Sequence, residues 1–146
     1  MIGGIYMAEF IAIELQEVTE NQNVLFTETP ICPTKGIFHR AGSGIVRVSG
    51  NATQNRARYL VSYSGNIQIP TGGTVEEISL AISIDGEPLA STQMIVTPTV
   101  VEALFNVSSQ AYIDVPCGCC ATVGVKNTSA QAIEVQNSNL IVVRVA

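Results

Sequence analysis

Residues 77–89, EISLAISIDGEPL, decide the fold class of this 146-residue chain. Aliphatic side chains occupy every second position from Ile78 to Ile84, and serine or alanine lies between them. A period of two is typical of a strand that buries one face. The run ends at Asp85-Gly86, a dipeptide that favours a tight turn between antiparallel strands. The stretch therefore predicts a half-buried strand followed by a β-hairpin.

The rest of the chain repeats this pattern and nowhere shows a convincing helical period. Turn-forming residues recur at a spacing of about eight to twelve residues, which predicts roughly ten short strands and an antiparallel β-sandwich or barrel. We find no linker, low-complexity run or internal repeat, so a single all-β domain is expected. The other predicted strands cover 10–18, 23–26, 44–50, 57–70, 92–109, 111–116, 120–127, 132–137 and 139–146.

The last predicted strand, NLIVVRVA (139–146), is apolar on both faces apart from Arg144. Such a strand belongs in the middle of a sheet or at a subunit interface, because an exposed edge of this composition would aggregate. The whole chain is 47% apolar and only 13% charged. A monomer with so few charges would expose apolar patches of the kind that mark contact surfaces. The composition therefore predicts an obligate oligomer.

Charge and hydropathy argue against two classes of partner. The net charge is −5 and the seven Lys and Arg residues are scattered, whereas binding to nucleic acid needs clustered basic side chains. The apolar stretch MIGGIYMAEFIAI (1–13) is interrupted by Glu9 and is too short to span a bilayer. It also lacks the features of a signal peptide. We expect neither a nucleic-acid nor a membrane partner.

Three of the four cysteines lie in VPCGCCATVGVKN (115–127), and the fourth is Cys32. Zinc sites usually use paired knuckles, and adjacent Cys119 and Cys120 would point to opposite faces of a strand. A zinc site shared by Cys32, Cys117, His39 and one of Cys119 and Cys120 stays open, as does a disulfide from Cys32 to the cluster. The favoured interpretation is a tight turn into a strand, with the cysteines as small, buried, reduced side chains. The sequence does not fix their redox state.

No arrangement of residues predicts catalysis. His39 is the only histidine and has no carboxylate close to it in the sequence. The glycine-rich AGSGI (41–45) lacks the flanking residues of a nucleophile elbow or a phosphate loop. The carboxylates are dispersed, and the neighbours Glu76 and Glu77 would point opposite ways on a strand. We expect a non-enzymatic protein without cofactor or metal.

From about residue 24 onward, the order of features resembles a tumour-necrosis-factor/complement-type jelly roll. The matching segments are NVLF (23–26), GIVRVSG (44–50), RYLVSYSGNI (58–67), LAISIDGEPL (80–89) and NLIVVRV (139–145). One departure is IDVPCGCC (113–120), where the family usually carries a Gly-Asp step. The resemblance implies an antiparallel jelly-roll β-sandwich that forms a homotrimer by burying one sheet face around a threefold axis. For that interface we predict Tyr59, Tyr63, Leu140 and Val142.

Three shorter stretches are similar to small proteins encoded among the virion structural genes of tailed bacteriophages and prophages of Gram-positive bacteria. They are FHRAGSGIVRVSG (38–50), DVPCGCC (114–120) with VKNTS (125–129), and QNSNLIVVR (136–144). This similarity implies a capsid decoration protein, made in the bacterial host cytoplasm, that binds the major capsid protein on the capsid exterior. It would stabilise the head.

The segment before the jelly roll is predicted to be an attachment arm. Residues 1–22 alternate weakly and end at the polar break TENQN (19–23), whereas 23–146 would form the jelly roll. An extended arm can add strand hydrogen bonds and apolar anchors to a partner. The predicted anchors, which would contact the capsid lattice or a neighbouring subunit, are Phe10, Ile11, Ile13 and Leu15.

A host- or glycan-binding trimeric tip is the alternative function. Its ligand would contact loops at 51–56, 71–74 and 127–131, and sugar sites usually offer an aromatic face beside polar groups. None of these loops contains an aromatic residue, which favours the decoration protein. A bacterial surface or spore-coat trimer is a third interpretation. The lack of a signal sequence, a collagen repeat and an anchor argues against its surface version.

Overall fold

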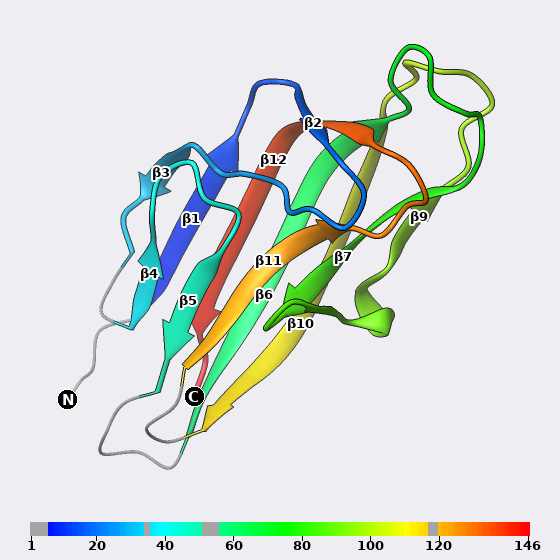
Figure 1. The fold of residues 1–146 in the computed structure, drawn as a ribbon. Helices are drawn as coiled ribbons and strands as arrows, with labels where there is room; N and C mark the ends of the chain where they lie inside the picture. The colour runs from blue at the N-terminus through cyan, green and yellow to red at the C-terminus, as the bar shows by residue number, and fades with distance from the viewer. Residues whose placement is uncertain (1–5, 34–35, 51–55, 117–119) are drawn as a thin grey trace.

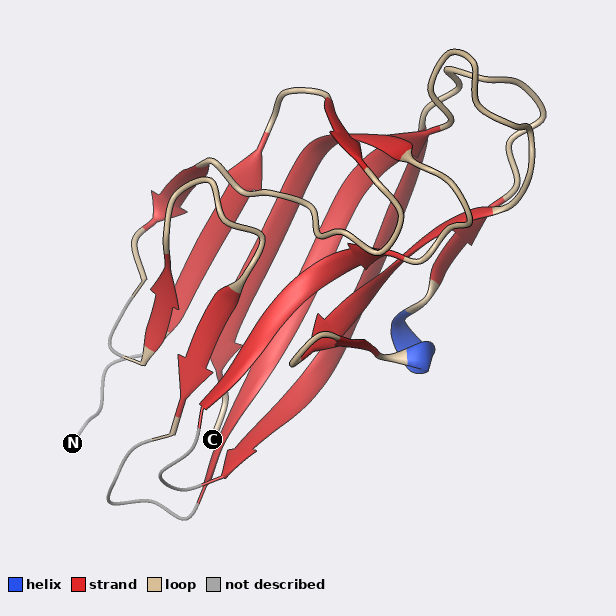
Figure 2. Cartoon of the chain, in the orientation of Figure 1, coloured by secondary structure: helices blue, strands red, loops and turns tan. Residues whose placement is uncertain are grey.

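In a computed structural model of the chain, two antiparallel sheets pack face to face as a β-sandwich (Figures 1 and 2). The structure describes residues 6–33, 36–50, 56–116 and 120–146. Sheet A has the strand order β10-β6-β12-β1-β3, with β2 also paired to β12. Sheet B has the order β4-β5-β11-β7-β8, with β9 also paired to β7. The predicted all-β sandwich is confirmed.

The strands of sheet A are β1 (Met7–Ala12), β2 (Gln16–Val18), β3 (Glu28–Ile31), β6 (Arg56–Gln68), β10 (Phe105–Pro116) and β12 (Ile133–Arg144). Those of sheet B are β4 (Ile37–His39), β5 (Val46–Ser49), β7 (Ile78–Ile84), β8 (Glu87–Pro88), β9 (Met94–Val96) and β11 (Cys120–Asn127). A 3-10 turn, η1 (Ala90–Thr92), follows β8. Across the described ranges, no helix has the length and apolar character needed to cross a membrane.

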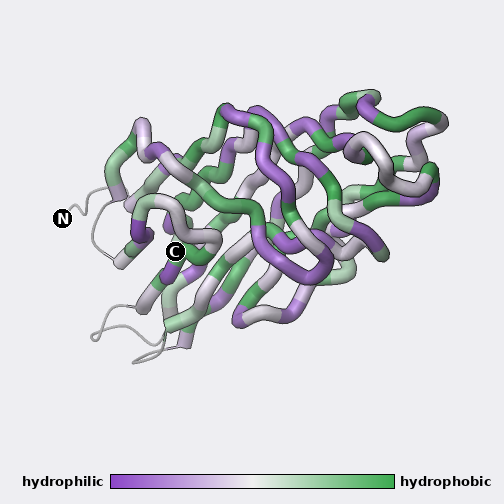
Figure 3. Tube along the Cα trace, turned by 45° about the horizontal axis from the view of Figure 1, so that its top comes forward, coloured by the Kyte–Doolittle hydropathy of each residue, from purple (hydrophilic) through white to green (hydrophobic). Residues whose placement is uncertain are grey.

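Large aromatic and aliphatic side chains from both sheets fill the space between them. Phe10, Phe26, Tyr59 and Tyr63 are all fully buried there. Each tyrosine hydroxyl has a hydrogen-bond partner: Tyr59 donates to the Ser49 carbonyl at 2.7 Å, and Tyr63 lies 2.9 Å from the Ser138 hydroxyl. Polar and apolar residues interleave along the strands, as the alternating colours of Figure 3 show. In β1, β5 and β12 this alternation separates a core-facing side from an outward side.

The hairpin that the sequence predicts after β7 is present. Asp85 and Gly86 both have positive φ, 52° and 87°, as a tight turn of this kind requires, and β8 pairs with β7. The prediction that this strand is half-buried is wrong, because every residue from Ile78 to Ser83 is buried. η1 lies at the edge of β7 between β8 and β9, where the Thr92 hydroxyl accepts a hydrogen bond from the Ile82 amide at 2.9 Å.

The C-terminal strand lies in the middle of a sheet, which confirms one of the two placements that its composition predicts. β12 runs between β6 and β1 and pairs with both. The two strands predicted for 132–137 and 139–146 are one strand with an irregularity between Gln136 and Asn139. Asn137 has a φ of 57° there, so a single left-handed residue absorbs the irregularity.

The predicted boundary between an arm (1–22) and a jelly roll (23–146) does not appear in the fold. β1 is an inner strand of sheet A: six of its residues pair with β12, and its other edge pairs with β3. Phe10 and Val18 are core residues. The polar stretch 19–23 is a turn at which Asn21 has a φ of 64°. The chain then continues beside β11, with Asn23 bridged to Lys126. Residues 7–22 are therefore part of the sandwich.

Candidate subunit interface

The outward face of sheet A carries an apolar row that crosses four strands. The register places Tyr112 of β10 opposite Leu60 of β6, Leu60 opposite Val143 of β12, and Val143 opposite Met7 of β1. Residues in register on one face of a sheet lie close enough to touch. Tyr112 is the most exposed of them, at 68%, although it is a large aromatic side chain. Among the described residues, the row is a continuous apolar band that is half-exposed at Met7, Leu60 and Val143 and widely exposed at Tyr112.

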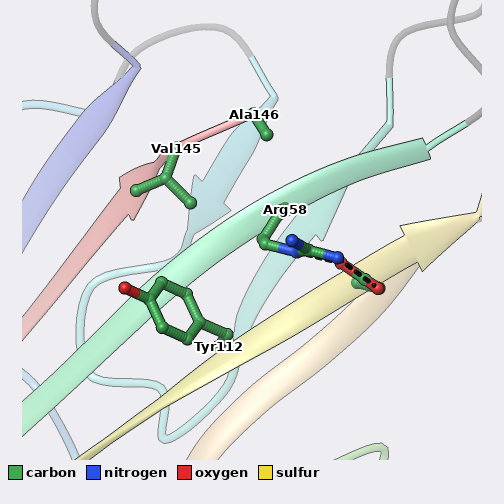
Figure 4. A pocket seen from close by; sticks show the side chains of 5 residues that line it. Arg58, Tyr112, Val145 and Ala146 are labelled. Atoms are coloured by element: carbon green, nitrogen blue, oxygen red, sulfur yellow. Dashed lines mark hydrogen bonds and ion pairs between the residues drawn. The ribbon is translucent and has the colours of Figure 1, made fainter.

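An ion pair and the C-terminus border this band next to Tyr112 and Leu60. Arg58 donates to both carboxylate oxygens of Asp114, at 2.7 and 3.1 Å. These hydrogen bonds, and the charge of Asp114, raise the pKa of Arg58 above its ordinary value. A hollow of about 560 Å³ lies between this pair, Tyr112 and the last two residues, Val145 and Ala146 (Figure 4). The shape offers a recess into which a neighbouring side chain could fit.

Beyond the apolar row, the same face becomes polar. A second hollow, of about 540 Å³, is lined mainly by small polar side chains: Ser62, Ser64, Ser108, Gln110 and Asn139, with Tyr63, Ser109 and Ile141. Farther along, Asn66 accepts a hydrogen bond from Asn106 at 3.0 Å and donates one to Asn137 at 3.1 Å. These ladders of amides and hydroxyls hold the surface groups of neighbouring strands in place.

Three carboxylates of this face each hydrogen-bond a neighbouring side chain. Asp114 pairs with Arg58, Glu134 accepts from Gln68 at 2.7 Å, and Glu9 accepts from Asn139. A carboxylate that is already hydrogen-bonded loses less on burial than a bare one. Arg58 neutralises Asp114, whereas Glu9 and Glu134 keep their charge and are hydrogen-bonded to side-chain amides. The outward face of sheet A thus combines an apolar row with polar groups that already have partners.

The four predicted interface residues do not lie on this face. Tyr59, Tyr63, Leu140 and Val142 have exposed fractions of 0–1% and point into the core of the monomer. The sequence prediction chose the core-facing set of alternate residues, and adjacent residues of a strand point to opposite sides of the sheet. The outward-facing neighbours are Leu60 on β6, and Ile141 and Val143 on β12.

The four predicted anchor residues are placed differently from one another. Phe10 is buried in the core, and Ile11 is half-buried on the outward face of sheet A, opposite Asn139. Ile13 and Leu15 are 51% and 44% exposed in the loop after β1. Only these last two remain open for contact with another molecule.

Two hydrogen bonds from the Gln16 side chain connect the end of this loop to the backbone of Leu25. The side-chain amide donates to the Leu25 carbonyl and accepts from the Leu25 amide, both at 2.9 Å. Leu25 is itself 47% exposed. Since the two hydrogen bonds hold the segments together, the exposed aliphatic side chains of Ile13, Leu15 and Leu25 are presented on a fixed backbone.

The residues considered for metal or thiol chemistry do not converge in the described ranges. His39 packs against Phe10, with ring centroids 4.6 Å apart, and its Nε2 donates to the Ser43 carbonyl at 2.9 Å. Cys32 and Cys120 are both exposed, so the predicted burial is wrong for Cys120 of the cluster. Cys117 and Cys119 lie outside the described residues. Within the described part of the chain, no three or more His, Cys, Asp or Glu side chains group as metal ligands.

Comparison with known proteins finds likeness in structure alone. No protein-family model matches the sequence, and no curated protein matches it. Murine APRIL at pH 5.0 superposes with a TM-score of 0.68 and 16% identity over 97% of this chain and 100% of that one. The fold is the tumour-necrosis-factor/complement-type jelly roll. The resemblance predicted from the order of strands is thus confirmed.

Two further jelly rolls show how widely the fold is used. The globular domain of zebrafish complement 1qA gives a TM-score of 0.58 at 11% identity, over 96% of this chain and 95% of that one. Vertex protein P5 of PRD1 gives 0.51 at 11% identity, over 99% and 100%. None of these three proteins is named as an enzyme, and the absence of catalysis in this jelly roll stays a prediction. At such identities the likeness concerns the fold only.

Proposed function

We propose that this protein is a virion structural protein, a homotrimer that decorates the outer face of a major capsid lattice and stabilises the head. The observation that carries the proposal is the apolar row on the outward face of sheet A, whose exposed part would be buried by contact with another subunit. Three copies would bring these rows together around a threefold axis, with Tyr112 and the hollow beside Val145 at the centre of the contact. A closed ring of this kind leaves no propagating edge.

The apolar row on the outward face of sheet A supports self-association over binding to a highly charged partner. The core of a protein–protein contact is depleted in charged residues and enriched in aromatic ones. Leu60 and Val143, which are half-buried in the monomer, would become fully buried in the trimer. The interface that we propose therefore consists of Tyr112, Leu60, Ile141, Val143 and Met7, in place of the core residues predicted from the sequence.

Contact with the capsid lattice would involve the exposed aliphatic side chains of Ile13, Leu15 and Leu25. Ile13 and Leu15 belong to the segment for which the sequence predicts an attachment role. The contact would be made by a loop fixed to the sandwich, because β1 is built into sheet A. Deletion of residues 1–22 would remove an inner strand and Phe10 from the core, so the deletion is expected to unfold the protein and is unsuitable as a test of attachment.

The virion role also draws on the PRD1 vertex protein, a jelly roll that is itself part of a virus particle. At 11% identity this comparison supports the fold as one used in virions and does not identify a partner. In this proposal the protein is made in the bacterial host cytoplasm and ends on the capsid exterior. Its partners are two further copies of itself and the major capsid protein.

The double variant Ile13→Ser/Leu15→Ser tests the attachment site. We expect the variant to remain folded and trimeric but to lose binding to capsids of the parent phage that lack this protein. Binding is measured by co-sedimentation and by electron microscopy of the decorated heads. The matched control is Val75→Ser/Val100→Ser, which changes two aliphatic side chains of similar exposure, 50% and 56%, in other loops. Normal decoration by Ile13→Ser/Leu15→Ser would refute this attachment site.

A further inference from the structure

The outward face of sheet B carries a basic and aromatic cluster at its edge. Phe38 of β4 lies directly opposite Arg47 of β5. Arg40 and Ile45 flank the turn between the two strands, and both line the same hollow as this pair. We call Phe38, Arg40, Ile45 and Arg47 the basic–aromatic cluster. All four side chains are exposed.

These side chains surround a small hollow. The guanidinium of Arg47 lies 5.9 Å from the centroid of the Phe38 ring, within the range of a cation–π contact. Phe38 nevertheless remains 62% exposed, so most of its ring still faces solvent. The hollow has a volume of about 270 Å³, and the hydroxyl-bearing residues Ser43 and Thr122 complete its lining. It is close to the lower end of the size range for small-ligand pockets, about 300 Å³.

The charge of the hollow is opposite to that of the protein. The chain has a net charge of −5 and only seven basic residues, yet two arginines line this hollow and no carboxylate does. Neither Arg40 nor Arg47 forms an ion pair with any residue that the structure describes. Arg58 on the other sheet is fully engaged with Asp114. The two guanidiniums of the hollow thus keep their forked donors available for an anion.

The backbone of the turn below the hollow is held in place. The Ser43 amide donates to the Arg40 carbonyl at 2.9 Å, and Gly42 has the positive φ of 86° that the turn needs. The Gly42 amide donates to the carbonyl of Phe26, a core residue, at 2.8 Å. Because the turn is tied to the core, the position from which Arg40 extends is fixed before any ligand binds, which reduces the entropy lost on binding.

We propose that the basic–aromatic cluster binds an acidic sugar residue, one that carries a carboxylate or a sulfate. Arg40 and Arg47 would donate hydrogen bonds to the anionic group. The open face of Phe38 would stack against the apolar C–H face of the sugar ring. The Ser43 hydroxyl accepts from the Ile45 amide and can still donate to a ring hydroxyl, whereas the Thr122 hydroxyl donates to Asp85 and can still accept from one. Carboxylated and sulfated sugars share this chemistry, and the experiment below separates them.

The position of the hollow favours a sugar over an acidic peptide. A peptide that binds by strand addition needs the free backbone edge of β4. The hollow instead lies on the face of the sheet, where only side chains are offered, and it has room for about one ring. It is also on the sheet opposite the proposed trimer contact, so formation of the trimer would leave it open. This inference goes beyond the decoration role and does not require it.

Calorimetric titration of the full-length protein at low salt tests the proposal. The probes are a heparin-derived hexasaccharide (sulfate and carboxylate), a hexagalacturonate (carboxylate only), the neutral maltohexaose and a ten-residue polyglutamate. We expect binding of at least one acidic oligosaccharide and none of maltohexaose. Arg47→Gln and Arg40→Gln should each weaken that binding by about ten-fold or more, the loss expected for one charge-assisted hydrogen bond. Phe38→Leu should also weaken it, because the ring that stacks is removed.

Lys126→Gln is the matched control, since it removes one positive charge from the same sheet outside the hollow. It should leave the affinity within about two-fold. A loss in Lys126→Gln as large as that in Arg47→Gln would show general charge attraction and overturn the site. So would the absence of binding to both acidic oligosaccharides. Binding of polyglutamate alone, with the same dependence on Arg47, would overturn the sugar in favour of an acidic polypeptide.

Discussion

The inward faces of the two sheets both pack into the core of this jelly roll, whereas their outward faces differ in chemistry. On the outward face of sheet A, an apolar row crosses four strands, and Asp114, Glu134 and Glu9 are each hydrogen-bonded to a neighbour. On the outward face of sheet B, two arginines lie beside an exposed phenylalanine with no carboxylate in their hollow. The first face suits burial against another protein, and the second suits an anion that arrives from solvent.

This difference cannot be seen in the composition of the chain. A charged fraction of 13% indicates that some surface must be covered, but it does not say which one. The sheet register locates it, because Tyr112, Leu60 and Val143 lie opposite one another only once the strands are paired. Outer faces, more than the shared core, therefore determine what a jelly roll can bind.

Leu60→Arg should have the largest effect on the association of subunits through sheet A. It places a charge in the middle of the apolar row, and burial of an unpaired charge costs about 3 kcal/mol or more per contact. We expect the variant to sediment as a folded monomer at micromolar concentration. Phe38→Arg, a similar change on sheet B, should leave the trimer intact. If both variants dissociate, or if neither does, the trimer contact does not lie on the outward face of sheet A.

Tyr63→Phe and Tyr112→Phe compare the inner and outer sides of sheet A. Tyr63 is buried and its hydroxyl contacts the Ser138 hydroxyl, so its loss leaves Ser138 without that partner. We expect Tyr63→Phe to lower the free energy of unfolding by about 1–2 kcal/mol. Tyr112→Phe should have almost no effect on a single subunit. Urea titration in the Leu60→Arg background measures both, and equal losses would contradict the assigned sides.

Alkaline pH should weaken the folded subunit through its core tyrosines. Burial raises the pKa of Tyr63 and of Tyr59 above the ordinary value of 10.0. The folded protein therefore keeps protons that the unfolded chain releases, so stability is full below about pH 10 and falls as the pH rises beyond it. Each tyrosine contributes a slope of at most about 1.4 kcal/mol per pH unit.

The free energy of unfolding of Tyr63→Phe, measured at several pH values above 10 in the same background, checks this assignment. Its dependence on pH should be shallower than that of the parent, because one buried phenol is absent. Tyr112→Phe serves as the control and should retain the parent slope. An unchanged slope in Tyr63→Phe would contradict the proposed role of Tyr63.

Arg58→Gln should have the smallest effect. Both partners of the pair are largely exposed, at 46% and 40%, and exposed ion pairs add little to stability. Thermal unfolding of the monomeric background should be unchanged within error, although the trimer could weaken because the pair borders its contact. A large drop in the melting temperature of the monomer would show that the pair supports the fold itself.

The sequence predicts the strands well because alternation and turn residues are local signals. The hairpin at Asp85-Gly86 and the central position of 139–146 are both present. The side of the sheet to which Leu140 and Val142 point could not be predicted, since Ile141 and Val143 are equally apolar. Choosing between them requires the register with β6, a long-range property. The proposed interface residues shift by one position for this reason.

Two features of the candidate sites were missed for different physical reasons. The polar stretch 19–23 suggests a boundary, but its backbone pairs with β11, and hydrogen bonding of this kind leaves no trace in composition. The basic–aromatic cluster did leave a signal: Phe38 and Arg40 precede AGSG, and Ile45 and Arg47 follow it, with both pairs at the spacing of two. Treating 38–47 as a hairpin would have placed all four on one face.

Sedimentation equilibrium of the unmodified protein at micromolar concentration tests the central claim most directly. The account predicts a single species with three times the 15.5 kDa mass of one chain, at every concentration in that range. A stable species with the mass of one chain would contradict it, because the apolar row of Tyr112, Leu60 and Val143 would then be tolerated in water without a covering surface.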